Sequence, residues 1–406
     1  MPKSHAEKLA ALADLAIRFG LNLEAGQTLY LTAPTAALDF VRHVTEAAYK
    51  AGAVDVMTFF SDDQMALARF RHGSEAALDH APGWLYEGLA GEAKDARIAR
   101  LGIYGETPSL LSGEDPGAVA RATRARAIAA KPLMDAMLGN TNWCVIAAAT
   151  PAWGQEVFPE MTPEAAEERL WDLIFQASRI DRDDPVAAWQ TDFEEIERRK
   201  SALNAAAFDA LHFTGGGTDL TVGLAAGHIW HGGTATRPDG RVFAPNIPTE
   251  EVFTMPDARR TSGRAVFTKP AIIAGTKIED LVVDFEDGRA VGVTASKGQE
   301  VVRQFLETDD GAPYLGEVAL VAESSPVAQT DTLFLNTLFD ENAACHIAFG
   351  QAYRTTLADD ADPSEVGMNQ SQIHQDCMIG HAGLDVDGLD ADGSRTPVLR
   401  AGEFVI

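Results

Sequence analysis

The chain has 406 residues, of which 46% are apolar and 23% charged, as is typical of a globular protein with ample material for a core. Its 60 acidic and 33 basic residues give a formal net charge of −27, which disfavours nucleic acid and anionic membranes as partners. The same charge favours cations, including divalent metals and the ammonium end of a peptide, although it would equally serve as a solubility surface.

The first half of the chain alternates between helix and strand patterns. Apolar residues recur at helical spacing from Leu9 to Phe19, and Gly20 closes this pattern. The patterns that follow predict strands at 28–32, 54–60, 98–104 and 143–148, helices at 36–51, 62–72 and within 116–138, and a helix capped by Thr162 and opened by Pro163. This alternation predicts a parallel sheet.

After about residue 205 short strand patterns follow one another. Residues 281–285 and 290–293 predict a hairpin whose turn contains Asp287 and Gly288. The length of the chain favours two domains. The acidic stretch 181–185 is the best candidate for the boundary between them. We therefore expect an α/β fold: an N-terminal parallel-sheet α/β domain, residues 1–180, followed by an α+β, strand-rich C-terminal domain, residues 181–406, which carries a metal site.

The cysteines and the N-terminus indicate a compartment. Cys144, Cys345 and Cys377 are few and odd in number, so we expect buried structural thiols rather than disulfides, with metal binding as the alternative for the two that adjoin candidate ligand segments. The first eight residues lack the apolar run of a signal peptide, and no stretch approaches the ~18 apolar residues of a membrane-spanning helix. We expect a cytoplasmic protein.

Familiar catalytic motifs are missing from the sequence. It contains no GxxxxGK[ST], no HExxH and no GxSxG with triad partners, so the phosphate-loop, zincin and serine-hydrolase classes lack their signatures. The run Gly215–Gly217 is interpreted as a turn between strands, with an anion-cradling or substrate-contacting loop as the alternative.

Side chains typical of metal ligands gather in four segments. The period of two in a strand places His374 and Asp376 on one face, and His346 and Tyr353, seven residues apart, would share one face of a helix if Gly350 did not break it. Glu317 opens an apolar strand, where an ionised carboxylate is costly unless it is paired or bound to a metal.

The fourth segment contains the adjacent residues Glu250 and Glu251, of which one should face inward, although the local pattern does not decide which. The four segments together supply two histidines, two glutamates and one aspartate, with no need of a thiolate. Such a set suits two divalent cations that share a bridging carboxylate.

These segments resemble the signatures of the M29 thermophilic-type metallo-aminopeptidases, and the resemblance covers nearly the whole chain. The residues that carry it lie in the segments 248–254, 316–321, 339–346, 350–353 and 374–380. The resemblance implies metal ligands at Glu251, Glu317, His346, His374 and Asp376, selects Glu251 over Glu250, and places Tyr353 in the active site. It also implies a peptide substrate with a free N-terminus, a cytoplasmic homodimer, and two divalent metal ions, with Zn²⁺ or Co²⁺ favoured and Mn²⁺ or Mg²⁺ as alternatives.

We expect Glu317 to bridge the two ions and Tyr353 to donate a hydrogen bond to the oxyanion, while Glu250 and Glu341 are weak candidates for a general base. One rival function is that of a ring-cleaving dihydroxypyridine dioxygenase, whose single iron needs two histidines and one carboxylate. Another is a peptide- or metal-binding protein on a degenerate peptidase scaffold, which would have lost a ligand or Tyr353. The presence of both Glu251 and Glu317 favours the peptidase.

Overall fold

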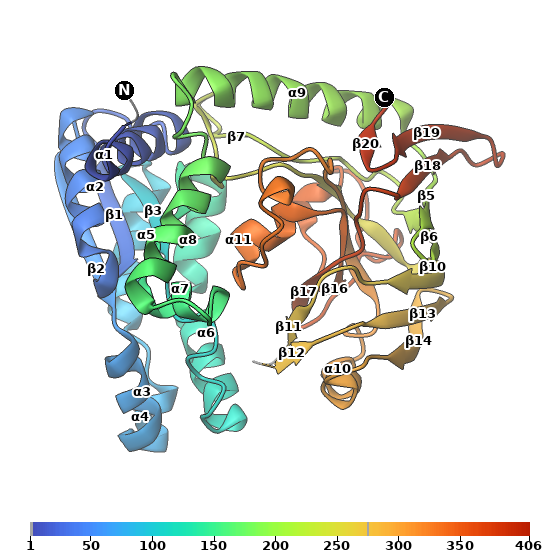
Figure 1. Cartoon of the computed structure of the whole chain (residues 1–406), viewed down its shortest axis with the longest axis horizontal. Coiled ribbons are helices and arrows are strands. Elements are labelled where there is room, and N and C mark those ends of the chain that lie inside the picture. The colour runs from blue at the N-terminus through green and yellow to red at the C-terminus, as the bar shows by residue number, and fades with distance from the viewer. Residues whose placement is uncertain (1–2, 274–275) are drawn as a thin grey trace. The chain divides into compact units, whose positions relative to one another are not determined.

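The structure, a computed structural model, describes residues 3–273 and 276–406, and the chain forms two units (Figure 1). The first unit comprises residues 1–191 and 234–248, and the second comprises residues 192–233 and 249–406. Helix α9 (Pro185–Ala206) contains the residues at which the first unit ends and the second begins. The boundary expected at 181–185 stays a prediction about which segments fold independently.

The first unit is built on a four-stranded sheet in the order β2-β1-β3-β4. Its strands are β1 (Thr28–Pro34), β2 (Asp55–Ser61), β3 (Ile98–Tyr104) and β4 (Trp143–Ala147). All neighbouring pairs are parallel, which confirms the sheet predicted from the alternation of elements. A short hairpin of β7 (Ala235–Thr236) and β8 (Val242–Phe243) belongs to the same unit.

The helices of the first unit include those predicted from 9 to 19, at 36–51, at 62–72, within 116–138 and from Pro163. They are α1 (His5–Asp14), continued by a π-helical turn to Gly20, α2 (Leu38–Lys50), α3 (Asp63–His72), α4 (Glu75–Asp79), α5 (Gly83–Lys94), α6 (Pro116–Asn140), α7 (Pro151–Val157) and α8 (Pro163–Ala177). The Thr162 side chain accepts a hydrogen bond from the Ala165 amide, which is the predicted N-cap. Apolar side chains such as Leu89 of α5 and Met137 of α6 pack with Tyr30 and Ile98 of the sheet.

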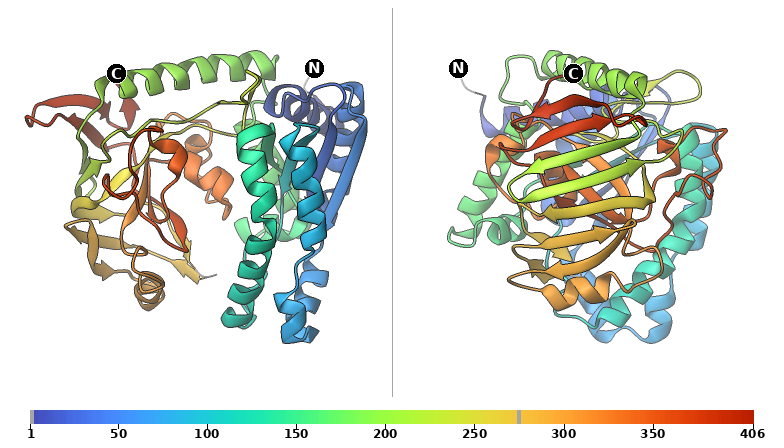
Figure 2. Two further views of the ribbon diagram at one scale, coloured as in Figure 1. Left: turned by 180° about the vertical axis from the view of Figure 1, so that it is seen from behind. Right: turned by 90° about the vertical axis from the view of Figure 1, so that its right-hand side faces the viewer.

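The second unit consists mainly of two antiparallel sheets. The larger has the order β14-β13-β10-β6-β5-β18-β19-β20, and Figure 2 shows its strands side by side. These strands are β5 (Ala210–Gly215), β6 (Thr218–Leu224), β10 (Pro256–Val266), β13 (Val282–Glu286), β14 (Arg289–Thr294), β18 (Asp385–Leu389), β19 (Arg395–Arg400) and β20 (Glu403–Phe404). The predicted 281–293 hairpin is confirmed by the antiparallel pairing of β13 with β14.

The smaller sheet has the order β17-β16-β15-β9. Its strands are β9 (Val252–Thr254), β15 (Leu315–Leu320), β16 (His346–Gly350) and β17 (His374–Met378). The unit is completed by the hairpin of β11 (Ala271–Ile273) with β12 (Thr276–Ile278) and by helices α10 (Gln299–Phe305) and α11 (Thr337–Asp340).

The glycine run at 215–217 forms a tight turn between β5 and β6. Gly215 pairs with Thr218, so Gly216 and Gly217 are the two turn residues, with φ angles of +59° and +94°. A side chain is disfavoured at such angles, which explains the glycines. The structure thus confirms the predicted turn between strands.

One face of the small sheet is apolar and belongs to the core of the second unit. Val318, Ile347, Phe349 and Cys377 join the same buried cluster as residues of the large sheet, and the ring of Phe349 stacks on that of Phe285 at 5.8 Å between centroids. Since successive strand residues point to opposite faces, the residues between these are directed to the other face.

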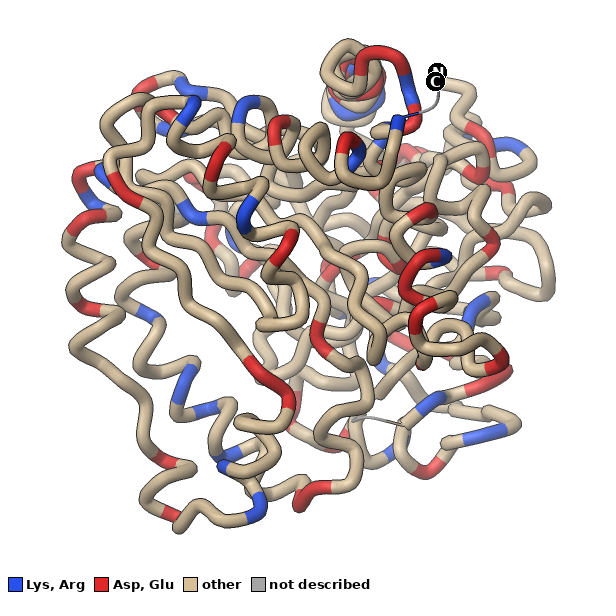
Figure 3. Tube along the Cα trace, turned by 60° about the vertical axis from the view of Figure 1, so that its left-hand side comes forward, with Lys and Arg blue, Asp and Glu red and all other residues tan. Residues whose placement is uncertain are grey.

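The cysteines match the expectation of buried thiols without disulfides. Cys144, Cys345 and Cys377 are free thiols and all three are buried. Acidic and basic positions are both distributed widely over the Cα trace (Figure 3). Within residues 3–273 and 276–406, no helix combines the length and apolar character that crossing a membrane requires.

Candidate metal centre

Strand pairing brings the five predicted ligands to one face of the small sheet. Glu317 of β15 pairs with Ala348 of β16, which pairs in turn with Asp376 of β17. His346 and His374 lie two residues before Ala348 and Asp376, and therefore share their face. Glu251 lies two residues before Phe253, which pairs with Ala319, so it reaches the same face from the end of β9.

A β-bulge at Gly316 determines which residues of β15 point to the core and which point to the ligand face. Leu315 pairs with Phe349 but Glu317 pairs with Ala348, so two residues of β15 span one step of β16. The bulge allows Leu315 to be buried in the core while Glu317 joins the ligand face. A side chain at position 316 has no room, since a Cβ there would lie 2.3 Å from the carbonyl oxygen of Gly350.

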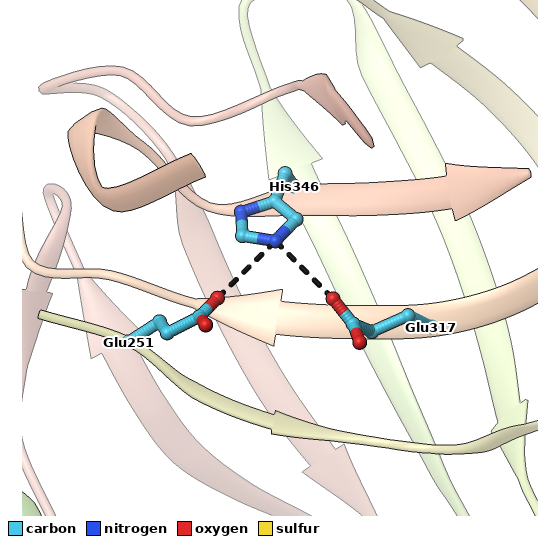
Figure 4. A group of neighbouring side chains, drawn as sticks. All are labelled: Glu251, Glu317 and His346. Atoms are coloured by element: carbon cyan, nitrogen blue, oxygen red, sulfur yellow. Dashed lines mark ion pairs between the residues drawn. The ribbon is translucent and has the colours of Figure 1, made fainter. Parts of the chain in front are cut away.

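The ligand atoms form two groups that have Glu317 in common. Glu251, Glu317 and His346 make one group, while Glu317, His374 and Asp376 make the other, and within each group the atoms lie within 4.8 Å of one another. In the first group, His346 Nε2 is 3.3 Å from Glu251 Oε2 and 3.4 Å from Glu317 Oε1 (Figure 4). In the second, His374 Nε2 is 3.3 Å from Asp376 Oδ1.

Both histidine rings are oriented by backbone carbonyls. His346 Nδ1 lies 3.1 Å from the carbonyl oxygen of Ala344, and His374 Nδ1 lies 2.7 Å from that of Gln351. A carbonyl oxygen only accepts, so each Nδ1 carries the proton and each Nε2 is available to a metal. Sequence reasoning missed these partners because they are backbone groups and carry no residue signature.

Buried polar atoms without hydrogen-bond partners indicate that these residues are suited to bind a metal ion. His346 Nε2 and Glu251 Oε2 are both buried, yet within the described part of the chain neither has a hydrogen-bond partner. Buried polar atoms are nearly always satisfied, so two that converge on one space call for an additional group. Nitrogen and carboxylate oxygen donors without a thiolate suit divalent ions such as Zn²⁺, Co²⁺ or Mn²⁺.

In the absence of a metal, raised pKa values keep several side chains of the centre protonated, which offsets the negative charge of its carboxylates. Burial raises the pKa of Glu251 to about 8, and the negative charge of Glu317 adds to this shift. Burial disfavours the His346 cation, but the neighbouring carboxylates outweigh it and raise its pKa to about 10. Burial likewise opposes the charge of His374, but Asp376 raises its pKa to about 9, while His374 lowers the pKa of Asp376 against the effect of burial.

Comparison with known proteins identifies the family of the chain. Residues 5–404 match the sequence model of the family described as thermophilic metalloprotease (M29). The chain belongs to the M29 family. Aminopeptidase T of Thermus thermophilus is 47% identical over 404 residues, covering 98% of both chains. Aminopeptidase 2 of Geobacillus stearothermophilus is 40% identical over 404 residues, again covering 98% of both, and aminopeptidase AmpS of Bacillus subtilis is 36% identical over 407 residues, covering 99% of both.

A solved structure of an M29 relative has the same fold. Wild-type AmpT from Thermus thermophilus superposes with a TM-score of 0.94 at 46% sequence identity, covering 99% of this chain and all of that one. The α/β fold with a strand-rich second part, expected from the order of helix and strand patterns in the sequence, is therefore confirmed.

Tyr353 lies beside the candidate metal centre of this M29 protein. Its ring centroid is 4.8 Å from that of His374, and burial together with the nearby carboxylates raises the pKa of its hydroxyl above the usual value, so the phenol keeps its proton. The helix considered for residues 345–353 is wrong, because His346–Gly350 is a strand. Ile347 and Phe349 must alternate with His346 and Ala348 to fill the core, and Tyr353 follows the strand instead of sharing a helix face with His346.

The two adjacent glutamates differ in their surroundings. Glu251 points at His346, whereas the backbone amide of Glu250 donates to Asn342 Oδ1 at 2.6 Å. Asn342 is completely buried and its Nδ2 donates to the Leu338 carbonyl, so it ties the segment before β9 to the turn that leads into β16. Nothing in the sequence singled out this asparagine.

Glu341, the other candidate for a general base, belongs to neither ligand group. Burial and the charge of Glu251 raise its pKa well above the usual value. This shift favours the protonated form of Glu341, which is the form that donates a proton rather than accepting one.

Proposed function

We propose that this protein uses two metal ions, bridged by Glu317, to remove single residues from peptides with a free N-terminus. Membership of the M29 family makes it a metallo-aminopeptidase. The observation that carries the dinuclear proposal is the shared position of Glu317, whose carboxylate belongs to both ligand groups. Glu251 and His346 would hold one ion, and His374 and Asp376 the other.

The bound ions would polarise the scissile carbonyl and lower the pKa of a bound water to ~7. The protein supplies the geometry. Ala344 and Gln351 fix the two imidazoles through their carbonyl oxygens, and the rigid sheet fixes the carboxylates. Ala348 lies between Glu317 and Asp376 in the same row of the sheet, where its small side chain leaves room for ions.

Tyr353 would stabilise the developing oxyanion. Its protonated hydroxyl can donate a hydrogen bond, and its ring lies beside His374, a ligand of the proposed second ion. The chain's strongly negative charge and the anionic ligand face together favour the approach of a peptide's ammonium group. Zinc or cobalt suits the nitrogen and oxygen donors, with manganese or magnesium as alternatives. We also propose a cytoplasmic homodimer, by analogy with the family.

The dioxygenase alternative is less well supported. A mononuclear iron site needs two histidines and one carboxylate, whereas here each histidine has its own carboxylate partner and Glu317 stands between them. The family match also favours the peptidase.

The test combines metal analysis with substrate chemistry. Elemental analysis after loading with zinc or cobalt should approach two ions per chain. A leucyl peptide should be cleaved at its first bond, and its N-acetylated form should react at least ~10²-fold more slowly, because loss of the N-terminal anchor misplaces the carbonyl. One iron per chain with oxygen consumption on dihydroxypyridine would contradict the dinuclear peptidase, and equal rates on the two peptides or first cuts at internal bonds would contradict aminopeptidase action.

A further inference from the structure

A small cavity of about 80 Å³ adjoins the ligand face of the second unit. Asp376, a member of one ligand group, lines it, and so does Met378, which lies two residues further along β17 and therefore on the same face. A larger hollow of about 490 Å³ is lined mainly by polar side chains such as Asp309 and Gln372, and none of the five ligands lines it. The smaller of these two cavities thus adjoins the proposed metal centre through Asp376.

Part of the wall of this cavity is aliphatic. Ile272 at the start of the β11–β12 hairpin and Leu333 and Leu335 of the loop before α11 form it together with Met378. No aromatic or basic residue is among the described residues that line the cavity, and its polar lining includes three acidic residues, Asp340, Glu341 and Asp376. The cavity therefore offers an aliphatic surface beside acidic and polar groups, one of which, Asp376, belongs to the metal centre.

The loop that supplies the aliphatic wall is held in a strained conformation. Leu335 has a φ angle of +58°, which a bulky residue rarely adopts. The buried carboxylate of Asp340 accepts hydrogen bonds from the amides on both sides of Leu335, at 2.8 Å from Phe334 and 2.9 Å from Asn336. Strain that the surroundings maintain in this way is typical of binding sites, and here it fixes an aliphatic side chain at the cavity wall.

The volume limits what can enter. A cavity of ~150 Å³ admits benzene, so about 80 Å³ accommodates an aliphatic group of about three or four carbon atoms but not an aromatic ring. An N-terminal residue whose carbonyl lay at the metal centre would have its side chain within reach of the cavity, because Asp376 belongs to both.

We propose that this cavity binds the side chain of the substrate's N-terminal residue and makes the enzyme selective for aliphatic over aromatic residues. The inference rests on the proposed aminopeptidase function. Leu333 and Leu335 are the residues that set the depth of the cavity, and Asp340 is a positioning residue that holds the loop.

The experiment measures kcat/KM of the metal-loaded, full-length enzyme on alanyl, leucyl and phenylalanyl p-nitroanilides. The kcat/KM of the wild type should be ~10-fold or more higher for the leucyl than for the phenylalanyl substrate. Differences of this size are typical when a substrate group is too large for an apolar pocket by one or two methylenes. Leu333→Ala should reduce this ratio at least threefold by admitting the ring, and Leu333→Phe should lower leucyl turnover while alanyl turnover persists. Leu85→Ala is the matched control, since Leu85 is also half-buried but lies on α5 in the first unit.

The outcomes separate the two proposals. If the wild type, with its metal content verified, cleaves none of the three anilides, the proposed function fails and the inference falls with it. If the anilides are cleaved but the leucyl-to-phenylalanyl ratio is the same in the wild type, Leu333→Ala and Leu85→Ala, the cavity does not bind the side chain. Inhibition by free L-leucine provides a second measurement: Leu333→Phe should raise its inhibition constant at least fivefold, and an unchanged constant would also overturn the assignment.

Discussion

Loading zinc into the metal-free protein at pH 7 should release about three protons, because metal ligands bind in their deprotonated form. The number follows from three groups that are protonated at pH 7 when no metal is present. They are His346, with a pKa of about 10, His374, at about 9, and Glu251, at about 8. Asp376 adds nothing, since its pKa is lowered and it is already ionised.

Isothermal titration calorimetry in buffers with different ionisation enthalpies measures this release directly. The apparent overall affinity should rise by up to ~10³-fold per pH unit between pH 6 and 7, and the dependence should weaken above pH 8 as Glu251 loses its proton. Release of less than one proton at pH 7, or an affinity that does not change between pH 6 and 8, would refute the idea that the empty centre holds these protons.

The raised pKa values of the same three groups determine how the stability of the metal-free protein changes with pH. Each of the three groups has a pKa in the folded protein above its ordinary value. Their contribution is fully present below the unfolded pKa and is lost as the pH rises through about 8, 9 and 10, respectively. The gain in melting temperature from added zinc should therefore be larger at pH 8 than at pH 6.

Four substitutions test the roles of single residues. Glu317→Gln should lose both ions and activity together, while Glu250→Gln should keep both, and metal analysis showing the reverse would mean that the shared ligand is wrongly identified. Tyr353→Phe should keep its metal content but lose ~10²–10³-fold in kcat, the effect of removing one oxyanion donor, so an unchanged kcat would assign the ring a packing role only. Gly316→Ala should destabilise the protein by ~1–3 kcal/mol in denaturant unfolding and weaken zinc binding, because a Cβ there meets the backbone of Gly350 and Gln351; wild-type values of both would contradict the structural role of the bulge.

Local patterns predicted the elements whose character depends on neighbouring residues. The parallel sheet, the cap at Thr162 and the hairpin turn at Asp287 and Gly288 all rest on periodicity or on the backbone preferences of turn residues. The strand that carries His374 and Asp376 was likewise predicted from its period of two, and the structure has it at His374–Met378.

What the sequence could not predict depends on long-range pairing. The local pattern left Glu250 and Glu251 equivalent, because the three-residue strand β9 takes its orientation from β15, more than sixty residues away. The apolar run around His346 fits either a helix or a buried strand, and only packing against the large sheet decides for the strand. Asn342 joins segments 92 residues apart through one backbone amide, a contact without a sequence signature.

The bulge at Gly316 explains why the ligand set depends on tertiary structure rather than on strand periodicity alone. In a regular strand Leu315 and Glu317 would point to the same face, so burying the leucine would also bury the glutamate in the core. The bulge separates them, because Leu315 pairs with Phe349 on the core side while Glu317 pairs with Ala348 on the ligand side. Only glycine leaves room for this approach, since the carbonyls of Gly350 and Gln351 lie where a Cβ would be. The bulge is therefore what allows one short strand both to complete the core and to supply the carboxylate common to the two ligand groups.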